Sequence, residues 1–284
     1  MPPLWEGGGG KPPHSEGMLT RESFVKHFGR KAVFGMVHLR PLPGAPLYGG
    51  SIRAVMEAAR SDARAIAGGG CDGMLFENFG DRPFARTVGP ETVAAMTRVI
   101  AEVARQIPLR FGVNVLRNDP AAALGIAAAS GAEFIRINIH TGAMLTDQGV
   151  IEGTAAETLR LRARLAPDVA IFADHMVKHA TPLAPLDEEQ AARDLRERGL
   201  ADAIILTGRE TGAPADLDGL RAIRGIIDAP ILIGSGVTAG NAPAYRDADG
   251  IIVGTALKKE GRVEAAVDIR RVRRIVRAFK GVDG

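Results

Sequence analysis

The amino-acid sequence predicts a single-domain α/β fold, a (β/α)8 TIM barrel. From Lys31 onward, short apolar runs alternate with longer amphipathic segments, and this alternation is the signature of repeated strand–helix units in a parallel sheet. There are eight such cycles, each of roughly 25 to 40 residues over about 250 residues, as in a (β/α)8 barrel. Doubly wound sheets usually contain fewer strands. The number and spacing of the cycles therefore favour a closed barrel.

The composition limits both the size of the core and the class of partner. A chain of 284 residues with 46% hydrophobic residues can bury one large core or two modest ones. Aromatic residues make up only 5% and the formal charge is +3, so the stacking platforms and basic surface that bind nucleic acid are scarce. Cys71 is the single cysteine, which excludes an internal disulfide and favours a reducing compartment. We therefore expect a cytoplasmic protein with no nucleic-acid partner.

The beginning of the chain differs in composition from the rest. Residues 1–19 are rich in glycine and proline and lack a periodic apolar pattern, so we expect a disordered tail. The barrel domain is predicted over residues 20–284. It begins with an extra helix over residues 20–29, in which Phe24 and Phe28 share one face. This helix is expected to close the floor of the barrel.

The eight predicted strands are short and either β-rich or continuously apolar, as expected when both faces of a sheet are covered. They occupy residues 32–39, 73–78, 110–116, 133–139, 169–175, 202–208, 230–236 and 250–256. The segments between them show helical periodicity. In residues 51–69, for example, apolar residues recur at three- and four-residue spacing after Ser51, which can cap the helix.

The last predicted helix, within "VEAAVDIRRVRRIVRAFKG", has an apolar stripe that includes Val272, Ile275 and Phe279. The rest of its surface is basic and carries Arg270, Arg271, Arg273, Arg274, Arg277 and Lys280. One interpretation is a docked helix with a solvated outer face. The other is a peripheral contact with an anionic membrane surface, because clustered basic residues on a helix are attracted to such surfaces.

Two glycine-containing turns follow the last two predicted strands. "ILIGSGVTAGN" places Gly234, Ser235 and Gly236 after the seventh strand, and "IIVGTALKK" places Gly254 and Thr255 after the eighth. In (β/α)8 barrels these two strand ends often bind phosphate, since glycine lets the backbone N–H groups approach the anion. Tight turns alone would also explain the glycines. Because both turns fall at the phosphate-binding positions, we predict a phosphorylated small-molecule ligand.

Polar residues at the other strand ends form a candidate active site, because loops at the carboxyl face of such barrels carry the chemistry. The predicted catalytic residues are His38, Glu77, Asp174 and His175. The predicted substrate-binding residues are Arg40, Asn114, Arg117, Arg136, Asn138, Lys178, Thr207 and Glu210. Side chains alternate across a strand, so adjacent residues such as Asp174 and His175 cannot both face the barrel axis within the strand.

Acid–base catalysis is the simplest mechanism for this set. Glu77 and Asp174 lie on well-separated strands, and His38 or His175 could titrate near neutrality. A divalent metal is an alternative, since imidazole and carboxylate suit zinc, manganese or iron. His175 and His179 have helical ligand spacing, although without the glutamate of an H-E-x-x-H motif. The prediction is a lyase, isomerase or epimerase, with the cofactor left open and a divalent metal as the candidate.

Two further roles remain open for the basic residues. Arg117 and Arg136 could clamp a second anionic group of the ligand, or each could pair with a neighbouring carboxylate. Lys178 could form a Schiff base, but its place in a loop beyond the fifth strand argues against that role.

Six motifs, in consistent order, resemble the BtpA/SgcQ family: "FGMVHLRPLPGAP", "GCDGMLFENFGD", "FGVNVLRND", "FIRINIHTGAMLTDQG", "FADHMVKHA" and "PILIGSGVTAGN". The resemblance runs from about Ala32 to Phe279 and implies a TIM-like barrel. It links the chain to photosystem I biogenesis with peripheral thylakoid association on one branch, and to sugar metabolism on the other. The resemblance implies no catalytic set.

Two hypotheses follow. The first is a cytoplasmic enzyme that acts on a phosphorylated sugar or nucleotide-like substrate. The second is a non-catalytic assembly or stability factor for a membrane complex, as the photosystem branch of the resemblance implies. Fold alone does not choose between them. A homo-oligomer is expected in either case, because barrels often associate through their outer helices.

Overall fold

A computed structural model describes residues 17–177, 180–208 and 216–281. Eight parallel strands close into a barrel in the order β1-β11-β10-β9-β7-β4-β3-β2. These strands are β1 (Ala32–His38), β2 (Gly73–Glu77), β3 (Arg110–Asn114), β4 (Phe134–Ile137), β7 (Ala170–Asp174), β9 (Ala203–Leu206), β10 (Ile231–Ile233) and β11 (Gly250–Val253). The ring closes where Ala32 of β1 pairs with Gly250 of β11. The predicted (β/α)8 barrel is confirmed.

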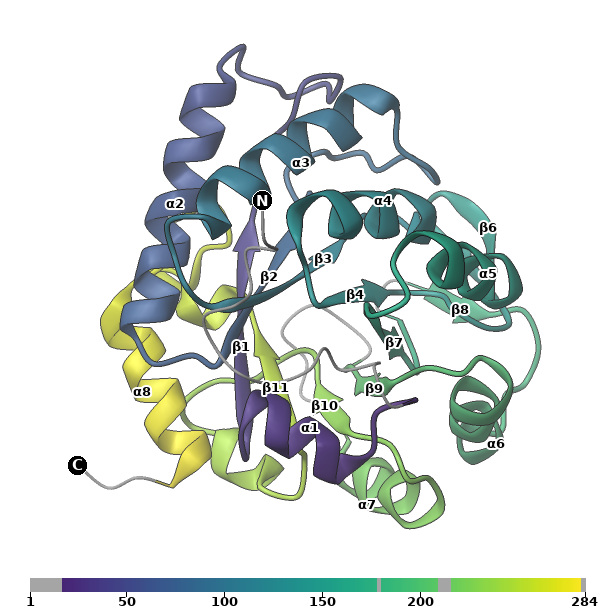
Figure 1. Ribbon diagram of the computed structural model, residues 1–284. Helices are drawn as coiled ribbons and strands as arrows, with labels where there is room; N and C mark the ends of the chain where they lie inside the picture. Colours follow the sequence, from purple (N-terminus) through teal and green to yellow (C-terminus); the bar gives the residue numbers. More distant parts are fainter. Residues whose placement is uncertain (1–16, 178–179, 209–215, 282–284) are drawn as a thin grey trace.

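Helices surround the barrel on its outside (Figure 1). They are α2 (Ile52–Gly68), α3 (Pro90–Ala104), α4 (Pro120–Ser130), α5 (Ala155–Leu165), α6 (Glu188–Arg193), α7 (Leu217–Ile226) and α8 (Ile269–Lys280). Helix α1 (Arg21–Phe28) lies instead across one end of the barrel. The connection between β10 and β11 is shorter and carries a 3-10 turn, η2 (Ala242–Tyr245), with Tyr245 buried. None of the helices in the described ranges is both long and apolar enough to cross a bilayer.

A small antiparallel sheet lies beside the barrel and was not predicted. It consists of β6 (Gly149–Glu152), β5 (Ala143–Thr146) and β8 (Ala180–Pro182), in that order. Its strands have only three or four residues each, which is too short for a clear period-two pattern in the sequence. The tip of the β5–β6 hairpin is held by Arg86, whose Nε donates to the Gln148 carbonyl at 2.9 Å.

The hydrophobic core has two parts. The larger part packs the outer faces of the strands against the surrounding helices. The smaller part fills the barrel interior and includes Phe34, Phe134 and Phe172, whose rings contact Phe28 of α1 at centroid distances of 5.3 to 6.0 Å. Phe24 and Phe28 are buried. The predicted N-terminal helix is therefore present, and its aromatic face fills the end of the barrel at which the strands begin.

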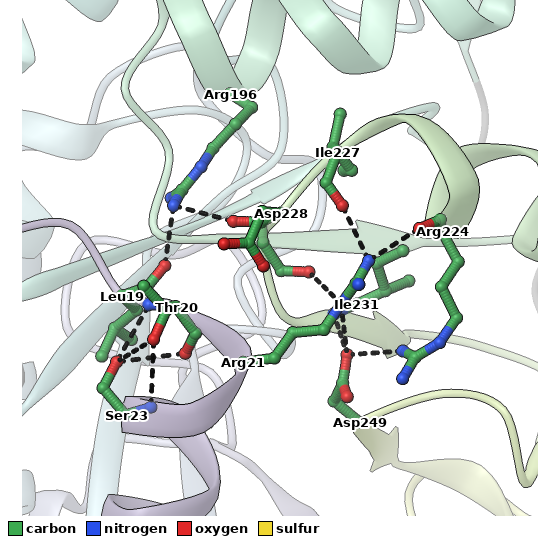
Figure 2. Close-up of polar contacts among 11 residues, drawn as sticks. Leu19, Thr20, Arg21, Ser23, Arg196, Arg224, Ile227, Asp228, Ile231 and Asp249 are labelled. Carbon is green, nitrogen blue, oxygen red and sulfur yellow. Dashed lines mark hydrogen bonds and ion pairs between the residues drawn. The ribbon is translucent and has the colours of Figure 1, made fainter.

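Polar contacts hold α1 against the chain that precedes β10 (Figure 2). The guanidinium of Arg21 donates to the Ala229 carbonyl at 3.2 Å, to the Arg224 carbonyl at 2.9 Å and to the Ile227 carbonyl at 2.7 Å. It also lies 3.8 Å from a carboxylate oxygen of Asp249. Arg21 thus satisfies one carbonyl group in the last turn of α7, that of Arg224, and two carbonyl groups just beyond the helix. Most of the predicted N-terminal tail, residues 1–16, lies outside the described residues.

Candidate active site at the carboxyl face of the barrel

A cavity of about 670 Å³ opens at the carboxyl ends of the barrel strands. Its lining brings together most of the polar residues that the sequence indicates. Those that line it are His38, Glu77, Arg117, Arg136, Asn138, Asp174, Gly234, Ser235, Gly236, Gly254 and Thr255. A cavity of this size accommodates a small-molecule ligand.

Asp174 ends β7 and is held from two sides. Arg136 of β4 binds it side-on through two hydrogen bonds, with Nε 2.9 Å from Oδ1 and Nη2 3.0 Å from Oδ2. Asn138 Nδ2 donates to Oδ2 at 2.8 Å. Burial opposes the charge of Arg136, but the Asp174 carboxylate outweighs burial and raises the pKa of that guanidinium. Both carboxylate oxygens are engaged, so Asp174 is better placed to orient its neighbours than to accept a proton.

Glu77 ends β2 and has different surroundings. Asn114 of β3 donates to its Oε2 at 2.7 Å, and His38 Nε2 of β1 lies 3.7 Å from its Oε1. The imidazole of His38 stacks on the Phe79 ring, with centroids 4.6 Å apart and planes 26° apart. Asn114 therefore supports the carboxylate, and the His38–Glu77 pair faces the cavity with the imidazole fixed in orientation.

The turn after β10 is shaped to leave its backbone accessible. Gly236 has a φ of +67°, in the left-handed region that glycine adopts without strain. Ser235 Oγ accepts the Gly208 N–H at 2.8 Å, and Asn241 Nδ2 donates to the Gly236 carbonyl at 2.8 Å. These bonds hold the turn in place from both sides.

The turn after β11 lies next to the imidazole. A Cβ on Gly254 would lie 2.9 Å from Cε1 of His38, so only glycine lets the main chain come this close. Within the part of the chain that the structure describes, the main-chain N–H groups of Gly236, Val237 and Thr255 donate no hydrogen bond. Free N–H groups of two turns that line one cavity are suited to an anion.

Arg117 follows β3 and also lines the cavity, with 7% of its surface exposed. Burial lowers the pKa of its guanidinium, against the opposing charges of Asp147, Asp174 and Glu77, while nearby Arg136 lowers it further. A guanidinium remains protonated in proteins despite such a shift. Arg117 is therefore a buried cation close to the carboxylates of the site.

Other predicted residues lie elsewhere. Arg40 is exposed and does not line the cavity. His175 points to the other face of β7, where Nε2 donates to the Glu188 carbonyl at 2.7 Å and burial lowers the pKa of its imidazole. Thr207 donates to the Met176 carbonyl rather than facing the cavity. Lys178, Glu210 and His179 lie outside the described residues.

Among the residues that the structure does describe, no three His, Cys, Asp or Glu side chains come together as a metal site.

The cavity also contains residues that sequence reasoning did not find. Phe79, Arg82 and Phe84 follow β2 in the stretch "FGDRPF", and Arg82 lies over the Phe79 ring at 5.4 Å. Their signal was the dense group of aromatic and basic residues directly after a strand end. Arg271 and Arg274 come from α8, and no local pattern separates them from the other arginines of that helix.

Comparisons with known proteins agree with this architecture. The model of the BtpA family matches residues 29–281. The chain is 46% identical over 250 residues to the photosystem I biogenesis protein BtpA of Synechocystis sp., with 87% of each chain covered. It is 35% identical over 247 residues to the sgc region protein SgcQ of Escherichia coli, with 85% of this chain and 91% of SgcQ covered.

A solved structure of (S)-3-O-geranylgeranylglyceryl phosphate synthase from Thermoplasma acidophilum, in complex with its substrate sn-glycerol-1-phosphate, has a TM-score of 0.54. The match covers 93% of this chain and 100% of that chain at 15% identity. At such identity the likeness concerns the fold. Family membership follows from the match to the family model over most of the chain and from the high sequence identity to the relatives. The chain belongs to the BtpA family.

Proposed function

We propose that this protein is a cytoplasmic enzyme that binds a phosphorylated small molecule and transfers protons on it, as a lyase, isomerase or epimerase. The observation that carries the proposal is that both glycine turns line the same cavity as His38 and Glu77. The structurally similar synthase with bound sn-glycerol-1-phosphate supports a phosphate ester as the ligand class. A phosphosugar fits the polar wall that Asn138, Arg117 and Glu77 provide.

The phosphate would bind where the two turns meet. Gly236, Val237 and Thr255 supply main-chain N–H donors with no acceptor in the described part of the chain. Such donors bind phosphate without a charged side chain, because several N–H dipoles converge on one anion. Asn138 lines the same cavity, and its Oδ1 is buried and has no hydrogen-bond partner among the residues that the structure describes. This oxygen would accept a hydrogen bond from a hydroxyl group of the ligand.

Proton transfer falls to His38 and Glu77 in this proposal. The imidazole is fixed by stacking on Phe79 and lies beside the β11 turn, so a ligand anchored by its phosphate would present its adjacent carbons to it. Glu77 would orient the imidazole and balance its charge, as carboxylates do for catalytic histidines. Arg136 and Arg117 would stabilise negative charge that develops on a carbonyl oxygen during enolisation. Asp174 would position Arg136.

Thermal-shift measurements test the phosphate site. Orthophosphate and a panel of phosphosugars should raise the melting temperature of the wild-type protein, because a ligand that binds only the folded state stabilises it. We call the phosphate site formed by the main-chain N–H groups of Gly236, Val237 and Thr255 the cradle. Gly236→Asp places a negative charge in this cradle and should abolish the shift in melting temperature. Gly240→Asp is the matched control, since Gly240 is exposed in the same loop and does not line the cavity.

A second variant guards against misfolding of Gly236→Asp, whose φ is unfavourable for most side chains. Thr255→Asp adds the same charge from the other turn and should also abolish the shift, while both variants keep a cooperative unfolding transition without ligand. An identical response of wild-type, Gly236→Asp and Gly240→Asp would refute the cradle. Once a turned-over phosphosugar is known, His38→Gln should lower kcat while leaving the ligand-induced melting shift intact.

A further inference from the structure

We propose that the side of the cavity next to α8 is a second anion subsite, formed by Arg271 and Arg274, and that the anionic end of the ligand is a diphosphate. This inference rests on the proposed function, because the cradle would hold the first phosphoryl group and the two arginines the second. It narrows the ligand class from any phosphate ester to compounds that carry two linked phosphoryl groups.

The two arginines belong to the same cavity as the cradle. Arg271 and Arg274 lie three residues apart and therefore on one face of α8, and both line the cavity together with Gly254 and Thr255. Arg271 is tied to the cradle loop itself, since its Nε donates to the Ala256 carbonyl at 2.9 Å. That bond leaves the two terminal nitrogens of its guanidinium for a ligand.

Their availability sets these arginines apart from three other basic residues of α8. Arg270 pairs with Asp268 at 3.3 Å, Arg273 donates to the Gly68 carbonyl at 3.3 Å, and Lys280 pairs with Asp72 at 2.7 Å. Arg274 makes no hydrogen bond or ion pair within the described part of the chain. On α8, the side chains of Arg270, Arg273 and Lys280 are thus bound to the protein, Arg271 and Arg274 line the cavity, and Arg277 is exposed outside it.

The start of α8 is held firmly, which fixes the helix backbone that carries the two arginines. Asp62 of α2 is buried and accepts both the Lys258 ammonium and the Val267 N–H. Asp268 caps the helix by accepting the Arg270 N–H at 2.9 Å. The guanidinium of Arg271 is held in addition by its bond to the Ala256 carbonyl, and a pre-positioned guanidinium loses less conformational entropy when it binds an anion than a mobile one does.

The distribution of charge favours a second phosphoryl group. Among the described residues, the carboxylates that line the cavity are Glu77 and Asp174. Both are engaged by barrel residues, Glu77 by Asn114 and Asp174 by Arg136. Within the described part of the chain, no carboxylate lines the cavity on the α8 side. Arg271 and Arg274 add two positive charges beside the main-chain donors of the cradle, which is more positive charge than one phosphate requires. The planar guanidinium groups suit phosphate oxygens.

Calorimetric titration with inorganic pyrophosphate and with orthophosphate, at matched ionic strength, tests the subsite. Arg274→Ala should weaken pyrophosphate binding by about tenfold or more, as expected for loss of a charge-assisted hydrogen bond, and should change orthophosphate binding by less than about twofold. Arg277→Ala is the control, because it removes the same charge from an exposed residue of α8 that does not line the cavity.

Each other outcome contradicts the proposal. Equal losses for both anions would mean that Arg274 serves the first phosphate, and equal losses for Arg274→Ala and Arg277→Ala would mean that only net charge matters. Orthophosphate binding with no gain for pyrophosphate would refute the subsite and leave the cradle intact. Failure of the wild-type protein to bind either anion would refute the cradle and the subsite together.

Discussion

Arg136 and Asp174 form a two-pronged ion pair inside the barrel mouth, where their side chains are only 7% and 0% exposed. They come from the neighbouring strands β4 and β7. Each partner neutralises a charge that would otherwise be buried at high cost. The pair therefore couples the stability of the barrel to the geometry of the candidate site.

Removal of one partner should be far more costly than removal of both. We expect Arg136→Met to lower the free energy of unfolding by about 3 to 5 kcal/mol, because it leaves the Asp174 carboxylate buried and uncompensated. Arg136→Met combined with Asp174→Leu should recover much of the loss. Urea denaturation measures both, and Arg193→Met, which breaks a more exposed pair with Glu189 on α6, should cost less than about 1 kcal/mol. Equal costs for Arg136→Met and Arg193→Met would contradict this account.

The contacts of Arg21 predict how strongly α1 is held to the barrel. Arg21→Ala removes three charge-assisted hydrogen bonds to carbonyl groups and should lower the free energy of unfolding by about 1.5 to 3 kcal/mol. Lys26→Ala serves as the control, since Lys26 is an exposed residue of the same helix. Chemical denaturation of both variants gives the comparison, and a similar effect of the two would show that the Arg21 contacts add nothing.

Glu133 predicts a pH dependence of stability. Burial raises the pKa of its carboxyl group, but the hydrogen bond from His27 and the charges of Arg110 and His27 outweigh burial, so the pKa lies below its ordinary value. The unfolded state then binds the proton more readily. The stabilisation is present above the ordinary carboxyl pKa of about 4.3 and is lost as the pH falls through the folded value.

The corresponding measurement is the unfolding free energy of wild-type protein and Glu133→Gln between pH 3 and pH 7. Wild type should be the more stable at pH 7, and the difference should shrink as the pH falls below about 4. Glu57→Gln, in an exposed pair with Arg53, should show little pH-dependent difference from wild type. A difference for Glu133→Gln that stays constant with pH would exclude the carboxylate as its source.

Two glycines in regular elements should respond to alanine in opposite ways. Gly125 lies within α4, and a Cβ there meets no atom within 4 Å, so Gly125→Ala should raise the free energy of unfolding by about 0.5 to 1 kcal/mol. Gly112 lies in β3, where a Cβ would come within 2.3 Å of the Phe134 ring. Gly112→Ala should lower the free energy by about 1 to 3 kcal/mol. Thermal or chemical unfolding measures both changes. A change of the same sign in the free energy of unfolding for the two variants would contradict the packing described for these glycines.

The sequence predicted which strand ends carry polar residues, but only the structure decided which residue of an adjacent pair faces the cavity. Asp174 lines it, and His175 points to the outer face of β7. Likewise, Glu77 lines the cavity, while Asn78 is bonded to both the N–H and the carbonyl of Leu116. Alternation requires that neighbours differ, whereas the choice depends on the register of each strand within the closed sheet.

For the basic last helix, α8, the sequence predicts even less about which side chains face the cavity. Its amphipathic pattern predicts one apolar stripe, and Val272, Ile275 and Phe279 are indeed buried. The pattern does not reveal that Arg274 faces the cavity while Arg277 does not. Contact with an anionic membrane through this helix stays a prediction, as does a homo-oligomer.

Taken by itself, the sequence determined the (β/α)8 barrel, the helix at its floor and the position of the two glycine turns, because each depends on local periodicity, on capping or on residues adjacent along the chain. The tertiary structure alone decided which side chains share a cavity. His38 meets Glu77 and Gly254, and Arg271 meets Ala256. Such contacts depend on strand register and on helix rotation about its axis, and these are set by packing over the whole barrel rather than by any short stretch of residues.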